Sequence, residues 1–474
     1  MHKAKTIDAV TTQSGVLAAL RAELGDRVSV SAEELESMRW DRSGLSAEGI
    51  PLCVVHAQEV SDVQAVMRIA NDWSAPVVTR GAGTSVAGGS FAGQDEIVLS
   101  LLAMNRIVHI NEAERYAVVE PGIINDHLDA ELRSRGFWFA PDPASRHMST
   151  VGGNIATNAG GLMCTKYGVT REAVLGLTVV LAGGEIIRMG RATAKGVTGL
   201  DITGLMVGSE GTLGVIVDAT VRIRAAVPGG VSTVTAYFPT VQQAASACSA
   251  VTAAAIQPMI MELMDERTVS AVHSYLSLSA PPQGASYVLV QTDGSGAQDE
   301  ATAVAEIFSS LGGDVHFAAN DEEAEELLRI RRSMHSAISS LGTTLIEDVC
   351  VPRDRLGEMF AVISDIERKY DLVIPVVAHA GDGNLHPTFM FDTPEPSPTI
   401  WAAAGDLFQA ALRLGGTLTG EHGVGVLKRR WLSDELGDTQ WRLQRDIKRV
   451  FDPKGILNPG KVFDDSPSLP SPQK

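Results

Sequence analysis

Two histidines, His379 and His386, stand seven positions apart in the segment HAGDGNLHPTFMFD at 379–392. The Gly-Asp-Gly-Asn sequence between them is typical of a tight turn, and the apolar runs on either side predict two strands. Such a hairpin would bring both imidazoles to one end of the strand pair. A lone histidine on an apolar strand is usually a satisfied core residue. Two neighbouring rings instead favour a shared positive partner.

A third candidate ligand, Glu421, follows an apolar helical segment in the sequence GEHG. Two imidazoles and one carboxylate are a ligand set that zinc takes when it keeps a position open for substrate. The same set suits manganese or iron(II), so the residue types alone leave the metal open. His422 comes next in the chain and points another way, because neighbours on a regular element face different directions. It is therefore a candidate general base beside the metal.

A glycine-rich segment at 80–90, RGAGTSVAGGS, follows a predicted Val-Val-Thr strand, where phosphate loops usually lie. Val86 replaces the third glycine of a Rossmann fingerprint, and Gly89 replaces the lysine of a P-loop. Neither nucleotide motif is satisfied. The exposed backbone N–H groups, the hydroxyl groups of Thr84 and Ser85, and Arg80 still form an anion nest suited to a diphosphate, with a ligand-free turn as the alternative.

Two more segments are built in the same way. PDPASRHMSTVGGNIATNAGG at 141–161 contains four glycines and two asparagines. So little side-chain volume argues against a packed core there and indicates that backbone approaches something flat and large. LMVGSEGTLGVI at 205–216 again places glycines ahead of a strand. Three such loops favour one large ligand.

The elements that must position these residues follow from periodicity. Apolar positions predict a helix over 61–73, capped by Ser61. Short strands alternate with helices after residue 230, and this alternation predicts an α/β or α+β unit built on one sheet. The predicted strands are STVTAYF, PMIMEL, SYVLVQT, GDVHFAA, TTLIEDVCV and LVIPVVAHA. A helix over 322–341 carries three arginines, and DEEAEE at 321–326 is expected to form its solvated first turns.

Bulk composition excludes several classes of protein. A chain of 474 residues is too long for one ordinary core. Its net charge of −18 repels phosphate backbones and argues against nucleic acid as a partner. No window approaches the roughly 20 apolar residues of a membrane span, and the amino terminus lacks a signal or transit pattern. The four cysteines form no Cys-x-x-Cys pair, which argues against an iron–sulfur cluster or zinc ribbon. A cytoplasmic protein is expected.

Seven segments in order carry a family resemblance: PVVTRGAGTSVAGG, TVGGNIATNAGG, KYGVTREAVLGL, GSEGTLGVI, AHAGDGNLHP, GEHGVG and NPGKVF. Over about 45–463 the chain resembles flavoproteins of the vanillyl-alcohol oxidase type, in particular the FAD-linked D-2-hydroxy-acid dehydrogenases. These include D-lactate dehydrogenase, D-2-hydroxyglutarate dehydrogenase and the glycolate oxidase catalytic subunit. The resemblance implies an α+β fold with an FAD-binding domain of two subdomains and a substrate (cap) domain on a mainly antiparallel sheet with helices. The implied divisions are an N-terminal helical segment (1–45), the FAD-binding domain (46–227), the substrate domain (228–420), a C-terminal segment returning to the flavin and metal site (421–463) and a disordered tail (464–474).

The resemblance also implies residue roles. The diphosphate of FAD would lie on Arg80, Gly81, Ala82, Gly83, Thr84, Ser85 and Gly88. The rest of the cofactor would contact Pro141, Asp142, Gly152, Gly153, Asn154, Thr157, Asn158, Gly161, Gly208, Glu210, Gly211 and Ile216. The first loop contains no histidine or cysteine for a covalent tether, so dissociable FAD is expected. His379, His386 and Glu421 would hold a divalent metal, with zinc favoured; Arg331 would bind the substrate carboxylate, and Asn384 would also contact substrate.

The implied reaction is oxidation of a D-2-hydroxy acid to the 2-oxo acid. The substrate chelates the metal, His422 takes the hydroxyl proton, and the C2 hydrogen leaves as hydride to flavin N5. Relatives that oxidise D-2-hydroxyglutarate carry a lysine where this chain has the neighbourhood of Ile346 and Glu347. A short monocarboxylate such as D-lactate is therefore favoured, while glycolate and longer D-2-hydroxy monoacids stay open.

Two other classes compete. A zinc hydrolase using the same ligands would be colourless and would leave the glycine-rich loops without a task. A cofactor-free binding protein would tolerate lost ligands, yet each expected metal and base position is filled. Electrons are expected to pass to a quinone, an electron-transfer protein or a partner subunit. The sequence leaves open a homodimer and a peripheral location at the membrane.

Overall fold

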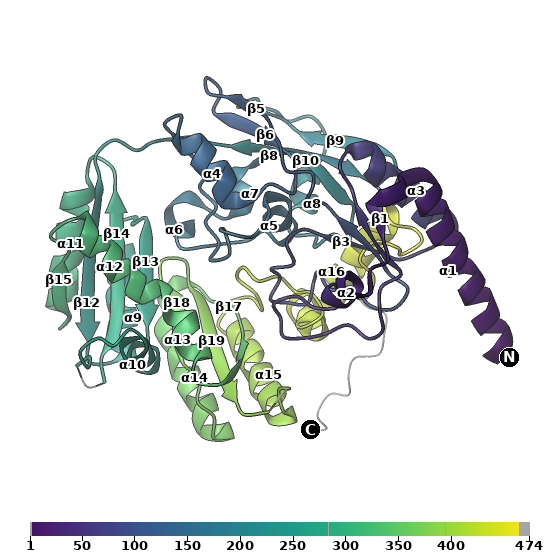
Figure 1. Cartoon of the computed structure of the whole chain (residues 1–474). Helices are drawn as coiled ribbons and strands as arrows, with labels where there is room; N and C mark the ends of the chain where they lie inside the picture. The colour runs from purple at the N-terminus through teal and green to yellow at the C-terminus, as the bar shows by residue number, and fades with distance from the viewer. Residues whose placement is uncertain (1, 283, 394, 464–474) are drawn as a thin grey trace. The chain divides into compact units, whose positions relative to one another are not determined.

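The computed structural model describes residues 2–282, 284–393 and 395–463 (Figure 1). It divides the chain into two compact units. The first contains Met1–Gly161, Val169–Ala226 and the segment that begins at Glu421. The second contains Leu162–Gly168 and Val227–Gly420. The predicted disordered tail at 464–474 lies outside the described residues.

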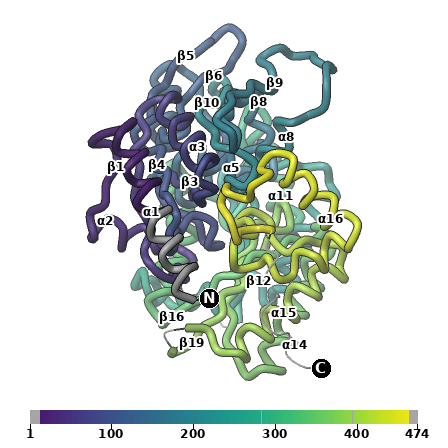
Figure 2. Tube along the Cα trace, turned by 90° about the vertical axis from the view of Figure 1, so that its right-hand side faces the viewer, coloured from purple at the N-terminus to yellow at the C-terminus, as the bar shows by residue number. Residues whose placement is uncertain are grey.

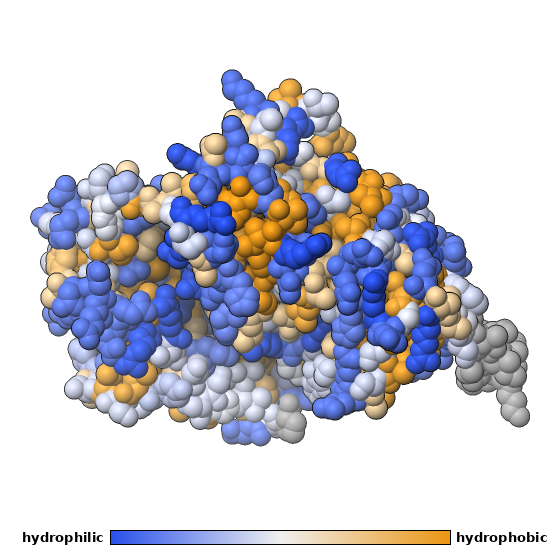
Figure 3. All heavy atoms as spheres, turned by 45° about the horizontal axis from the view of Figure 1, so that its top comes forward, coloured by the Kyte–Doolittle hydropathy of each residue, from blue (hydrophilic) through white to orange (hydrophobic). Residues whose placement is uncertain are grey.

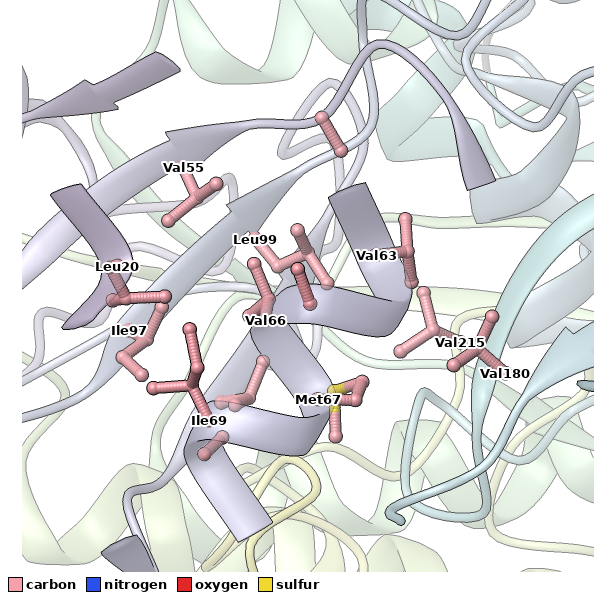
Figure 4. Packing of buried hydrophobic residues seen from close by; sticks show 14 of the residues in the cluster. Leu20, Val55, Val63, Val66, Met67, Ile69, Ile97, Leu99, Val180 and Val215 are labelled. Atoms are coloured by element: carbon pink, nitrogen blue, oxygen red, sulfur yellow. The ribbon is translucent and has the colours of Figure 1, made fainter. Parts of the chain in front are cut away.

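The first sheet of unit one has the strand order β1-β2-β4-β3. These strands are β1 (Val28–Ser29), β2 (Cys53–His56), β4 (Ile97–Ser100) and β3 (Val77–Arg80). β4 pairs in parallel with β2 and β3, whereas β1 pairs antiparallel with β2. The helices α1 (His2–Leu24) and α3 (Val60–Trp73) contact each other, and α2 is Ala32–Ser37. Figure 4 shows the apolar side chains of α3 packed beside those of the sheet: Val63, Val66, Met67 and Ile69 with Val55, Ile97 and Leu99.

The start of α3 corrects one prediction. The helix begins in a capping box, in which the side chains of Glu59 and Asp62 each accept a backbone N–H of the other residue. Ser61 lies inside the first turn and is not the cap. The carboxylates satisfy the N–H groups that the predicted serine cap would have satisfied.

The second sheet of unit one is antiparallel, with the order β5-β6-β10-β8-β9. Its strands are β5 (Ile107–Asn111), β6 (Tyr116–Val119), β10 (Val215–Arg222), β8 (Val174–Val180) and β9 (Ile186–Gly190). The short strands β7 (Phe137–Trp138) and β11 (Arg224–Ala225) form a separate pair. The accompanying helices are α4 (Asn125–Arg133), α5 (Val151–Thr157), α7 (Thr170–Ala173), α8 (Ile202–Met206) and α16 (Leu432–Phe451). Two sheets with their helices fit the predicted two-subdomain arrangement.

Unit two is built on an antiparallel sheet with the order β15-β12-β14-β13-β18-β19-β16, and β17 pairs with β19. The strands are β12 (Val231–Phe238), β13 (Ile260–Met264), β14 (Ser286–Asp293), β15 (Asp314–Phe317), β16 (Thr343–Ile346), β17 (Val349–Cys350), β18 (Val376–His379) and β19 (Asn384–Phe391). The predicted mainly antiparallel sheet is confirmed. TTLIEDVCV forms two strands and not one. Both keep the same register against β19, and the break falls at Glu347, whose N–H donates to the carbonyl of Pro387, a residue with no N–H to donate in return.

Helices cover the sheet of unit two. One face packs against α10 (Glu266–Tyr275), α12 (Asp321–Arg332) and α13 (Met334–Ser339). The other helices are α9 (Val241–Ala253), α11 (Ala297–Ser310), α14 (Leu356–Tyr370) and α15 (Pro398–Arg413), with α6 (Cys164–Tyr167) against β13. Figure 2 shows α14 and α15 side by side, as does Figure 1. The helix predicted over 322–341 is two helices that meet at Ser333, and DEEAEE does form the exposed first turns of α12.

The surface is mixed. Figure 3 shows hydrophilic side chains over much of one face, with apolar side chains gathered in patches between them. Among the described residues, no helix combines the length and the apolar character that crossing a membrane requires.

Candidate active site

The first glycine loop follows β3, which ends at Arg80, and the side chain of this arginine holds the loop by hydrogen bonds. Its guanidinium donates to the carbonyls of Ser90 (2.7 Å) and Trp40 (2.8 Å). Burial lowers the pKa of Arg80. Gly83 has a φ of +70°, a conformation that favours glycine, and a Cβ there would lie 2.2 Å from Arg80 Nη2, so a larger residue would displace the guanidinium. The structure thus ties Arg80 to backbone carbonyls, whereas the sequence analysis expected it at the diphosphate.

The loop closes on itself and on the next glycine segment. Ser85 Oγ accepts the backbone N–H groups of Ala87 and Gly89, both at 3.2 Å. A Cβ on Gly81 would lie 2.4 Å from Thr150 Oγ1, which caps α5 by accepting from the N–H of Gly153. The first and second glycine segments are therefore in contact within unit one.

The second segment does contribute to a packed core, contrary to the prediction. Val151 and Ile155 of α5 are buried in the same apolar cluster as the five-stranded sheet. The glycines around them allow backbone segments to touch, since a Cβ on Gly152 would lie 2.5 Å from Pro121, and one on Gly161 would lie 2.5 Å from Asp142. Small residues therefore serve internal packing as well as any ligand.

The third segment docks on the end of α5. The N–H groups of Gly208 and Glu210 donate to the carbonyls of Ile155 and Ala156. The side chain of Glu210 turns elsewhere, and its carboxylate accepts from the N–H groups of Val424 (2.7 Å) and Gly425 (2.9 Å). Burial raises the pKa of Glu210 to about 7, against the lowering effect of these two N–H groups and of Lys428. Glu210, predicted only as a cofactor residue, therefore anchors the segment that follows Glu421 and His422.

Asn458 is a structural residue that the sequence analysis did not single out. It lies in NPGKVF, and its Nδ2 donates to the carbonyls of Glu210 (2.6 Å) and Gly89 (3.0 Å). It thereby joins the first and third glycine loops. An asparagine within one of the seven family segments was the available signal.

Several buried polar atoms beside these loops fit a large polar ligand. Within the described part of the chain, four of them have no hydrogen-bond partner: Thr79 Oγ1, Ser149 Oγ, Asn154 Nδ2 and Asn458 Oδ1. Native proteins rarely leave such atoms without a partner. A dinucleotide such as FAD, with its diphosphate, hydroxyl and amide-like atoms, offers the donors and acceptors that they lack. The other predicted cofactor residues lie in the same segments: Ala82, Thr84, Gly88, Pro141, Asp142, Thr157, Asn158, Gly211 and Ile216.

The predicted hairpin is confirmed in unit two. β18 and β19 pair antiparallel with Val377 opposite His386 and His379 opposite Asn384, so all four side chains lie on one face of the sheet. β19 begins at Asn384, two residues earlier than predicted. Both histidines are buried, and their ring centroids are 5.1 Å apart with an interplanar angle of 87°.

A buried carboxylate that the sequence analysis missed lies behind His379. β18 pairs with β19 along one edge and with β13 along the other, and Glu262 of β13 lies directly opposite His379. The distance from Glu262 Oε1 to His379 Nδ1 is 2.7 Å. Because an ionised carboxylate only accepts, Nδ1 is the donor in this contact, and in the neutral ring Nε2 then carries the lone pair. The signal in the sequence was one glutamate within the apolar strand PMIMEL.

The same glutamate binds Arg331. Arg331 Nε donates to Glu262 Oε2 at 2.7 Å, and Arg331 Nη2 forms an ion pair with the same oxygen at 2.6 Å. The neighbouring arginines differ, since Arg329 and Arg332 pair at the surface with Glu326 and Glu325. Arg331, the arginine assigned to the substrate carboxylate, is only 6% exposed. Of the three, it is the arginine on the side of the histidine pair.

A second buried carboxylate lies beside His386. Asp348 Oδ2 accepts from Thr419 Oγ1 at 2.6 Å, and its Oδ1 is 3.9 Å from His386 Nδ1. Gly420 follows Thr419 and lies so close to Asn384 that a Cβ would be 2.4 Å from its Cγ. Glu421 and His422 are the next two residues of the chain, and consecutive Cα atoms lie about 3.8 Å apart. The assignment of Glu421 as a ligand stays a prediction.

Comparisons with known proteins identify the family. An FAD binding domain model matches residues 51–190, and a model of the C-terminal domain of FAD linked oxidases matches 228–462. Glycolate oxidase subunit GlcD of Bacillus subtilis is 38% identical over 422 residues, which are 88% of this chain and 90% of that protein. D-lactate dehydrogenase of Archaeoglobus fulgidus is 35% identical over 412 residues, which are 86% of this chain and 90% of that protein.

The solved structure of p-cresol methylhydroxylase with substrate bound has a TM-score of 0.78 at 18% identity, covering 97% of this chain and 98% of that one. This likeness concerns the fold alone and confirms the predicted vanillyl-alcohol oxidase type. The chain belongs to the FAD-linked oxidoreductases of the glycolate oxidase and D-lactate dehydrogenase family.

Proposed function

We propose that this chain oxidises a short D-2-hydroxy monocarboxylic acid, with D-lactate as the model substrate, to the 2-oxo acid. The observation that supports it best is the pair of buried histidines, whose ring centroids are 5.1 Å apart. They lie on the same sheet face as Glu262, which forms a buried ion pair with Arg331. Bound FAD would supply the hydride acceptor, its N5 atom. A cation for a carboxylate and two imidazoles for a metal are what a 2-hydroxy acid would need.

The proposal includes a divalent ion, zinc first, held by His379, His386 and Glu421. The donor chemistry fits, because the hydrogen bond to Glu262 leaves His379 with its lone pair on Nε2. Such an ion would supply positive charge that lowers the pKa of a substrate hydroxyl.

The remaining roles belong to protein side chains. His422 takes the hydroxyl proton as general base. Arg331, oriented by Glu262, binds the substrate carboxylate. Asn384 also contacts substrate; within the described residues its buried Oδ1 has no hydrogen-bond partner, so it can accept from a substrate hydroxyl.

A monocarboxylate is preferred because of charge. Where enzymes for D-2-hydroxyglutarate carry a lysine, this chain has Ile346 and Glu347, and Glu347 is fully buried. A second substrate carboxylate would gain no cation there and would approach a buried acid. We therefore place D-2-hydroxyglutarate behind D-lactate.

Glycolate is the second candidate substrate. The relative at 38% identity bears the name glycolate oxidase subunit, as does a 31% identical relative from Escherichia coli. Glycolate lacks the methyl group of lactate and would meet the same metal, base and arginine. We further propose that FAD is bound without a covalent link and that a quinone or an electron-transfer protein reoxidises it.

Anaerobic bleaching of the flavin absorbance tests the proposal. The purified protein is mixed with D-lactate, L-lactate, glycolate or D-2-hydroxyglutarate, before and after treatment with a chelator. We expect D-lactate to bleach the flavin fastest and the chelator to abolish bleaching until zinc is restored. Bleaching by L-lactate alone, or full activity after complete metal removal, would contradict the proposal. Faster bleaching by glycolate would favour the second candidate.

A further inference from the structure

We infer that Glu262 is a positioning residue that fixes both the imidazole of His379 and the guanidinium of Arg331. It lies in the middle of β13 and is 1% exposed. The inference rests on the proposed function, in which these two side chains bind metal and substrate. It adds a third side chain that acts through both.

The geometry gives each oxygen of Glu262 its own partner. Oε1 accepts from His379 on the neighbouring strand β18, and Oε2 accepts from Arg331 on helix α12. Ile260 and Met264, on the same face of β13, are buried in the apolar cluster that α12 covers. Glu262 thus interrupts an apolar row at the place where strand register and helix packing bring the two partners together. A shift of its carboxylate would move both.

The chemistry suits positioning. A carboxylate that accepts from Nδ1 of a ligating histidine fixes the tautomer and the ring orientation and raises the basicity of Nε2. The Nε–H hydrogen bond and the ion pair of Nη2 with the same oxygen hold the guanidinium of Arg331 against this carboxylate. The guanidinium of Arg331 supplies a positive charge that balances the charge of Glu262 inside the core.

A purely structural ion pair is the competing explanation. In that case Glu262 only ties α12 to the sheet, and its loss lowers stability without changing how a metal is coordinated. Metal affinity and the spectrum of a bound metal therefore separate the two explanations.

The test uses Glu262→Gln, which keeps the shape of the side chain and removes its charge. Glu367→Gln is the matched control, because Glu367 also pairs with an arginine of unit two, Arg267, at 3.1 Å. Metal-depleted flavoprotein is titrated with Co²⁺, whose visible absorption reports the coordination geometry, and Zn²⁺ competition gives the affinity. We expect Glu262→Gln to weaken Zn²⁺ binding about 10–100-fold and to alter the Co²⁺ bands. Its KM for D-lactate should rise, while Glu367→Gln should match the wild type in all three measurements.

Glu262→Gln leaves the buried charge of Arg331 without its counter-charge, and this can prevent the variant from folding. The double variant Glu262→Gln with Arg331→Met removes both charges and still tests whether the carboxylate at His379 affects metal binding. Wild-type Zn²⁺ affinity and Co²⁺ bands in either soluble variant would overturn the inference and leave the proposed function standing. Failure of the wild type to bind Co²⁺, or binding that is unchanged by His379→Ala, would overturn both. The two outcomes are distinguishable, because the first is measured on the Glu262 variants and the second on the wild type and His379→Ala.

Discussion

At the residue scale, the proposed chemistry depends on one proton acceptor, His422. Replacing it with alanine should leave flavin and metal content unchanged but slow flavin reduction by D-lactate about 10²–10⁴-fold, because a general base typically contributes that much. Stopped-flow measurement of anaerobic flavin bleaching gives the rate. His316→Ala is the control, since His316 pairs with Glu323 at the surface of unit two. Reduction of His422→Ala at the wild-type rate would rule out this histidine as the base.

Arg331 and Arg332 offer a matched pair of substitutions one position apart. Arg331 is buried against Glu262, whereas Arg332 pairs with Glu325 at the surface. Arg331→Lys should raise the KM for D-lactate, because lysine cannot reproduce the planar fork that the carboxylates contact. Arg332→Lys should leave steady-state kinetics unchanged. Equal effects of the two substitutions would remove Arg331 from the substrate site.

Residue types revealed part of this site in advance. The hairpin that carries the histidine pair was predicted from its local pattern, whereas Arg331 was assigned from the family resemblance alone, and both roles stay predictions. Glu262 was not found, although a glutamate inside an apolar strand is a signal that a buried partner exists. Its partners depend on the register between β13 and β18 and on where α12 packs, and neither is encoded over a few residues.

At the scale of elements, the third glycine loop holds the segment that carries the proposed base and ligand. Glu210 accepts from Val424 and Gly425, and burial raises its pKa to about 7 from an ordinary value of 4.5. Between these values the folded state binds more protons than the unfolded state. The free energy of unfolding should therefore fall as pH rises from 4.5 to 7, by about 3 kcal/mol in total from this group.

Glu210→Gln should remove this part of the pH dependence. Denaturant unfolding of the FAD-bound protein at several pH values between 4.5 and 7 measures it. The surface variant Glu172→Gln should keep the wild-type slope. A Glu210→Gln protein with an unchanged slope would show that the carboxylate does not titrate in this range.

Boundaries of elements were harder to predict than their existence. The alternation after residue 230 predicted the strands of unit two, yet TTLIEDVCV was expected as one strand and 322–341 as one helix. The gap between β16 and β17 falls opposite Pro387 of β19, which has no N–H for the ladder, and this cross-strand partner cannot be read from TTLIEDVCV itself. The predicted cap of α3 was wrong for a different reason. Ser61 and the Glu59–Asp62 capping box are both acceptable local signals, and the helix uses the second.

At the scale of the whole molecule, the cofactor loops and the histidine pair belong to different units with separate cores. The fold class followed from seven ordered segments, since order along a chain is something a sequence does encode. FAD should therefore stabilise the molecule unevenly. The buried polar atoms of Thr79, Ser149 and Asn154 have no hydrogen-bond partner among the described residues, and bound FAD would supply partners beside them.

Removal of FAD should increase amide hydrogen exchange in the three glycine segments of unit one. Exchange should rise most in 81–90 and 150–161, because protection by a ligand that binds only the native state is lost when the ligand is removed. Strands β12 and β14, whose backbone bonds belong to the sheet of unit two, provide the internal control. Mass spectrometry of peptides from holoprotein, apoprotein and FAD-reconstituted protein would measure the difference. A uniform rise across both units would mean that FAD stabilises the chain as a single cooperative body, and the loops would then have no special share in holding the cofactor.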